Sequence, residues 1–70
     1  MIIYELKVFT SATKIFSASN YNMIYSDYDK AIYNYYLFRD TTPNLEKIEL
    51  KKLEDKDGHF GTIEIVASFS

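Results

Sequence analysis

A single stretch of this sequence, Ser26–Asp40, has the apolar spacing of a helix, and the segments on both sides of it alternate with the period of β-strands. Ser26 and Asp29 form a capping-box pattern at its start. Pro43 disfavours helical geometry at the residue before it, so we expect the helix to end near Phe38–Asp40. One helix between two pairs of strands predicts an α+β fold, in which a small antiparallel sheet of about four strands, in the order ββαββ, carries the helix on one face.

The two strands expected before the helix come from residues Ile2–Phe9 and Thr13–Ser19. Ile2–Phe9 alternates between two faces and is rich in β-branched and aromatic residues, as strands are. A short turn follows it. We expect the second strand to continue irregularly toward Tyr25, because Asn20 and Asn22 favour a bend or a bulge.

The segment Leu45–Leu53, after the helix, fits either a helix or a strand. Its residues are good helix formers, but strand alternation places Ile48 and Leu50 on one face, with charged residues on the other. Asp55–Gly58 then has the composition of a tight turn, with glycine where a positive φ is needed. Because Thr62–Val66 alternates clearly beyond that turn, we predict a hairpin of two strands.

The length of 70 residues indicates one domain, spanning residues 1–70. A chain of this size buries only about 60% of the surface that its unfolded form exposes, so its core is small. It contains no cysteine and a single histidine, which excludes disulfides and disfavours a zinc site. Seven tyrosines and five phenylalanines supply the bulk of the core instead, and association with a partner is a common further source of stability.

The expected helix has more apolar side chains than one buried face needs. At 100° per residue, one arc faces the core, and it contains Tyr28, Ala31, Ile32, Tyr35 and Phe38. Tyr33, Tyr36 and Leu37 form a second stripe that lies away from this arc. These side chains either lie flat over their neighbours and add to a thin core, or form a surface that binds another protein, since tyrosine is enriched at interface anchors.

The sheet face opposite the helix poses the same question. It should present Ile3 and Phe9, and also Ile15 if the second strand is in register. If these residues are adjacent, an apolar patch would favour self-association, so we expect a homodimer. The alternative is that the chain termini or the segment Asn20–Tyr25 folds over them.

Charge argues against a general nucleic-acid binder, because the net charge is −2 and the lysines alternate with acidic residues. Glu54, Asp55 and Asp57, together with Glu64, should make one end of the second hairpin acidic. This acidic end either keeps the hairpin soluble and unpaired or docks into a basic groove of a partner, such as one that normally holds nucleic acid.

Candidate catalytic residues are scarce. His59 follows the hairpin turn and is best explained as a solvated turn residue, and the turn lacks the glycine and glutamate spacing of a calcium loop. We therefore predict no enzyme activity, no metal site and no cofactor. No apolar run approaches the roughly 20 residues that span a bilayer. Glu5 and Lys7 interrupt the apolar N-terminus, which therefore lacks the continuous apolar region of a signal peptide. We expect a cytoplasmic protein.

The succession of the "SDYDKAIYNYYLF" helix, the "TTPNLEKIEL" return and the "EDKDGHFGTIEIV" hairpin resembles a group of very small phage and mobile-element proteins. Some anti-CRISPR and other anti-defence proteins look like this, and they act by binding another protein. The resemblance implies a non-enzymatic protein-binding module, encoded by a phage and inhibiting a host defence or nucleic-acid enzyme in the host cytosol. The alternatives are a small nucleic-acid-binding regulator and a structural subunit that is active as an oligomer.

Overall fold

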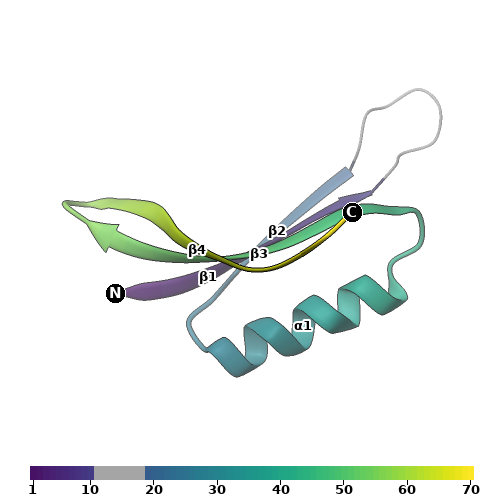
Figure 1. Ribbon diagram of the computed structural model, residues 1–70, viewed down its shortest axis with the longest axis horizontal. Helices are drawn as coiled ribbons and strands as arrows, with labels where there is room; N and C mark the ends of the chain where they lie inside the picture. The colour runs from purple at the N-terminus through teal and green to yellow at the C-terminus, as the bar shows by residue number, and fades with distance from the viewer. Residues whose placement is uncertain (11–18) are drawn as a thin grey trace.

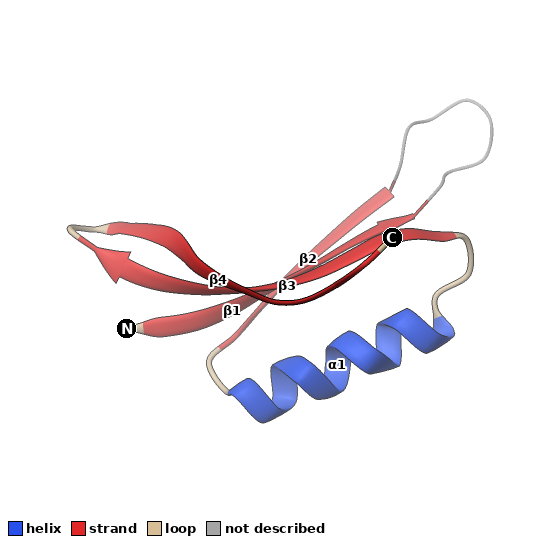
Figure 2. Ribbon diagram, viewed as in Figure 1, coloured by secondary structure: helices blue, strands red, loops and turns tan. Residues whose placement is uncertain are grey.

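A computed structural model describes residues 1–10 and 19–70 and contains one antiparallel sheet with a helix against one face (Figures 1 and 2). The five elements follow the order β1, β2, α1, β3, β4. Their bounds are β1 Ile2–Thr10, β2 Ser19–Tyr25, α1 Tyr28–Thr41, β3 Leu45–Lys56 and β4 His59–Phe69. The strands lie side by side in the order β2-β1-β3-β4. The predicted α+β class and the ββαββ order are therefore confirmed.

The core lies between α1 and the two central strands. Leu6 on β1 is opposite Met23 of β2 and Leu50 of β3, and its side chain is fully buried. The alternation predicted for β1 thus holds, because every second residue faces the helix. Six hydrophobic residues make up the buried core: Leu6, Val8, Ala31, Tyr35, Ile48 and Leu50.

The segment after the helix is a strand, as the alternation of Ile48 and Leu50 predicted, and both of these side chains are fully buried. The hairpin turn explains why strand pairing prevails over the good helix propensity of this segment. Asp57 and Gly58 have φ values of 53° and 82°, the positive values that a two-residue hairpin turn requires. This turn returns the chain directly into β4, which pairs with β3 along its length.

The helix begins two residues later than predicted, and its cap is Asp27 rather than Ser26. The Asp27 carboxylate accepts a hydrogen bond from the backbone N–H of Lys30 at 3.3 Å. A carboxylate at this position is also attracted to the positive end of the helix, which favours Asp27 over the neutral serine. At the other end, the helix continues to Thr41 before the N–H of Thr42 closes it on the carbonyl of Phe38 at 3.0 Å.

The second strand also differs from the prediction. β2 pairs with β1 without interruption from Ser19 to Tyr25, so the bend expected at Asn20 and Asn22 does not occur in these described residues. The side-chain amide of Asn22 donates to the Glu5 carboxylate at 3.1 Å, which gives this polar residue a partner within a regular strand. β2 lies at an edge of the sheet and does not fold over its open face. The rest of the predicted strand, residues 13–18, lies outside the described residues.

Candidate protein-binding surface

The inner side of α1 packs against the sheet much as its spacing predicted. Ala31 and Tyr35 are buried, and Ile32 and Phe38 pack against the core. Tyr28 differs, because it keeps 45% of its surface exposed. It is the first residue of the helix, and its ring makes an edge-on contact with the ring of Tyr4 on the central strand β1, with the ring centroids 5.6 Å apart.

The second stripe of apolar residues lies on the outer side of α1, where it is exposed to solvent. Tyr33, Tyr36 and Leu37, which we call the outer stripe, are 66%, 46% and 42% exposed. Residues three and four positions apart are neighbours on a helix, so these three side chains form one continuous surface. None of the three side chains is fully buried, but Tyr36 and Leu37 keep less than half of their surface exposed, so both interpretations of the surplus apolar residues stay open.

One ring of the outer stripe is held in place by its neighbours. The Tyr36 ring packs edge-on against the buried Tyr35 ring, with centroids 5.1 Å apart. The guanidinium of Arg39 lies over the Tyr36 ring, 4.8 Å from its centroid, and the Arg39 Nε bonds the Asp40 carboxylate at 3.1 Å. A partner that binds a ring already fixed in this way loses less side-chain entropy than one that must order it.

Tyr35, which supports this ring, has a pKa that depends on its position in the core. Burial raises the pKa of the Tyr35 hydroxyl above its ordinary value of 10.0, and the positive charge of Arg39 offsets part of this shift. The folded state therefore holds this proton more tightly than the unfolded chain does. The resulting stability is fully present below the unfolded pKa, and it is lost as the pH rises through the folded pKa.

We expect the Tyr35→Phe variant, which cannot ionise at this position, to lose less stability than the wild type between about pH 9 and pH 12. Urea unfolding at both pH values measures this difference. Tyr33→Phe is the matched control, since it removes the same hydroxyl group from the solvent side of the same helix. Identical pH profiles for the two variants would show that Tyr35 ionisation does not contribute.

The open face of the sheet does not bring the predicted self-association residues together. Ile3 and Phe9 share this face and are partly buried, but they are six residues apart on one strand, which is roughly 20 Å. Glu5 and Lys7 occupy the same face between them. Ile15, the third residue of the predicted patch, lies outside the described residues.

Charged residues of opposite sign fill the centre of this open face. In the register, Glu5 is opposite Lys51 and Lys7 is opposite Glu49. Glu49 also pairs with two lysines of its own strand, at 3.4 Å to Lys47 and 3.5 Å to Lys51. Charged side chains therefore interrupt the centre of this face, which is not a continuous apolar patch.

Three of the four predicted acidic residues lie at the end of the β3–β4 hairpin, whereas Glu64 lies in the middle of β4, opposite Lys52. Asp55 and Asp57 are exposed, and Glu54 is partly buried. The N–H of Asp55 donates to the carbonyl of Met1 at 3.1 Å, which joins the base of this end to the N-terminus. Figure 1 shows the turn projecting away from α1. The predicted partner-binding residues therefore form two separate surfaces, the outer stripe and the acidic hairpin end.

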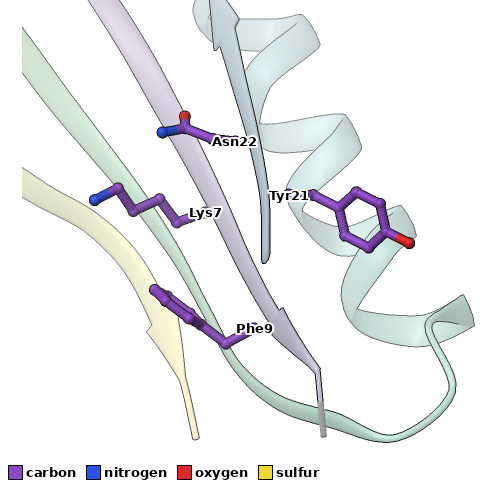
Figure 3. Close-up of a pocket in the computed structure, with 4 residues that line it drawn as sticks. All are labelled: Lys7, Phe9, Tyr21 and Asn22. Atoms are coloured by element: carbon purple, nitrogen blue, oxygen red, sulfur yellow. The ribbon is translucent and has the colours of Figure 1, made fainter. Parts of the chain in front are cut away.

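A shallow pocket of about 130 Å³ lies beside the β1–β2 pair. Its described lining consists of Lys7, Phe9, Tyr21 and Asn22, and Figure 3 shows Tyr21 pointing to the opposite side of the strand from the other three. The volume is below the roughly 300–1,000 Å³ of typical small-molecule sites. The pocket is therefore too small to define a ligand site.

Within residues 1–10 and 19–70, no group of three or more His, Asp or Glu residues is placed to hold a metal ion. The helix of the described chain is too short and too polar to cross a membrane. Comparison of the chain with protein-family models, with curated proteins and with solved structures finds no match. The function must therefore be argued from the surfaces of this chain.

The sequence analysis did not single out the exposed apolar residues of the edge strands. Tyr21 and Ile24 on β2 and Ile63 and Ile65 on β4 are all about half exposed. Their exposure follows from the position of β2 and β4 at the two edges of the sheet. Strand order is a long-range property, so no local pattern in the sequence indicates it.

Proposed function

We propose that this protein is a non-enzymatic module that binds another protein through the outer stripe. The observation that carries this proposal is that the six-residue core is complete without Tyr33, Tyr36 and Leu37, which remain exposed on one side of the helix. A helix that presents apolar residues at i, i+3 and i+4 fits a hydrophobic groove on a partner. Tyrosine at such positions supplies a large contact area at low entropic cost.

The acidic hairpin end suggests the class of partner. Three carboxylates at an exposed end, on a chain of net charge −2, favour a protein with a basic surface. Grooves that bind nucleic acid have such surfaces. Together with the resemblance to small phage proteins, this supports a target among host defence or nucleic-acid-processing enzymes, inhibited in the host cytosol by occupation of the groove.

Capture of the partner with matched variants tests this proposal. The immobilised wild-type protein, a Tyr33→Ala/Leu37→Ala double variant and an Ile63→Ala/Phe69→Ala double variant are each exposed to host cytosol. The last pair removes one aliphatic and one aromatic side chain of similar exposure from the sheet. We expect a protein that is retained by the wild type and by the sheet variant and lost from the helix variant. Retention by all three would contradict a role for the outer stripe.

The same proposal makes a prediction about nucleic acid. Because the chain has a net charge of −2, and Lys47 and Lys51 of its open face both contact Glu49, it should bind generic DNA or RNA weakly. Fluorescence anisotropy with single- and double-stranded oligonucleotides at physiological salt measures the affinity. We expect no saturation at micromolar protein. Submicromolar, salt-sensitive binding would instead support a nucleic-acid-binding regulator.

A further inference from the structure

The two edges of the sheet differ in how they are protected against pairing with another strand. An edge strand presents a row of unpaired backbone N–H and C=O groups, and proteins commonly block it with bulges, charges or proline. β4 has such protection. Its pairing with β3 is irregular at Leu50/Lys51 and again at Lys52/Leu53, and it carries Glu64 in its middle. These bulges twist the strand and interrupt the flat row of groups that a partner strand needs.

β2, at the opposite edge, has none of these features in its sequence or register. Its seven residues, SNYNMIY, include no charged residue and no proline. All seven pair with β1 in consecutive register, and no shift is recorded along this described strand. Tyr21 and Ile24 lie on opposite faces of β2, and each is 55% exposed. A strand added beside β2 would thus have an apolar side chain next to it on both faces of the sheet.

We propose that β2 pairs antiparallel with β2 of a second copy of this chain, which joins the two four-stranded sheets into one. With Asn22 opposite Asn22 of the second copy, the register uses all seven residues, since Ser19 then meets Tyr25 of the second copy. Tyr21 lies opposite Met23 of the second copy, a pairing of ring and thioether that is favourable. Because β2 is neutral, no like charges face each other in this register.

A second copy suits this edge better than a flexible peptide does. Its β2 is already ordered by pairing with β1, so association does not require the ordering of a disordered strand. The contact of two seven-residue strands is small, which places the dimer among weak, reversible complexes. A two-fold axis that passes between the two Asn22 residues, perpendicular to the sheet, leaves the α1 helices of both copies on the same face of the joined sheet. The dimer therefore presents the outer stripes of both copies on one side. Formation of the dimer does not depend on whether the outer stripe binds another protein.

Sedimentation equilibrium between about 10 μM and 1 mM tests the proposal, a range that suits a weak interface. The wild type should change from monomer to dimer. Asn22→Glu should raise the dissociation constant at least about tenfold, because two carboxylates then face each other across the axis. Within each monomer, the variant loses the hydrogen bond that Asn22 donates to Glu5, and the new carboxylate is repelled by Glu5. Lys7, opposite position 22 in the register, offsets part of this cost, so urea unfolding of the variant accompanies the measurement. Ile65→Glu is the matched control on β4, where Lys51 is opposite, and it should dimerise like the wild type.

A cysteine cross-link tests the register independently of the comparison between Asn22→Glu and Ile65→Glu. The chain contains no cysteine, so Asn22→Cys supplies a single thiol, and mild oxidation should link two chains at this position. Ile65→Cys should remain largely unlinked under the same conditions. A wild-type protein that is monomeric at about 1 mM would overturn the proposal and leave β2 to a strand of another protein. A dimer that Ile65→Glu disrupts while Asn22→Glu does not would overturn it as well.

Discussion

Truncation of Leu6 to alanine should unfold much of this protein. Leu6 is fully buried on a central strand, where it faces the helix and is opposite Met23 and Leu50 on the neighbouring strands. Removal of a buried leucine side chain leaves a cavity and costs about 2–5 kcal/mol of folding free energy. A chain of 70 residues has a total stability of only about 3–10 kcal/mol. A large fraction of the Leu6→Ala protein should therefore be unfolded at physiological temperature.

Leu37→Ala is the matched control for this prediction, because the chemical change is identical and Leu37 is 42% exposed. It should change the free energy of unfolding by no more than about 1 kcal/mol. Urea unfolding followed by circular dichroism measures both variants. Equal losses of stability would mean that Leu37 contributes to the core as much as Leu6 does, and the outer stripe would then be a structural feature.

Local patterns in the sequence predicted most of the fold. Alternation identified β1 and the hairpin and placed Ile48 and Leu50, which are buried, on one face, because side-chain direction in a strand depends on the residue's position alone. Helical spacing separated Ala31 and Tyr35 from the outer stripe for the same reason. The cap was misplaced by one residue, since Ser26 and Asp27 are both good cap residues and the choice depends on the exact path of the chain.

The parts that could not be predicted depend on contacts between distant segments. The alternation of β1 placed Ile3 and Phe9 on one face with Glu5 and Lys7 between them, but it could not show which residues of β3 lie opposite these four. It also could not identify β2 as an edge strand, and its asparagines suggested a bend where the structure has a regular strand. The difference between the two edges is visible only once the strand order is known.

Loss of the outer stripe should weaken partner binding strongly without unfolding the protein. Tyr33 and Leu37 lie on the solvent side of α1, so their replacement by alanine leaves the core unchanged. Tyrosine anchors at interface centres commonly contribute 2 kcal/mol or more when truncated, which is about a 30-fold change in the dissociation constant. Charge reversal at the hairpin end, for example Asp55→Lys, should mainly slow association and weaken its dependence on salt.

The dissociation constant of the Tyr33→Ala/Leu37→Ala variant for the captured partner, measured by isothermal titration calorimetry, tests the central claim most directly. The proposal predicts a rise of at least about 30-fold relative to the wild type, while the free energy of unfolding changes by about 1 kcal/mol or less. The Ile63→Ala/Phe69→Ala variant should bind as the wild type does. A folded helix variant that binds its partner with unchanged affinity would contradict the claim that the outer stripe is the contact surface.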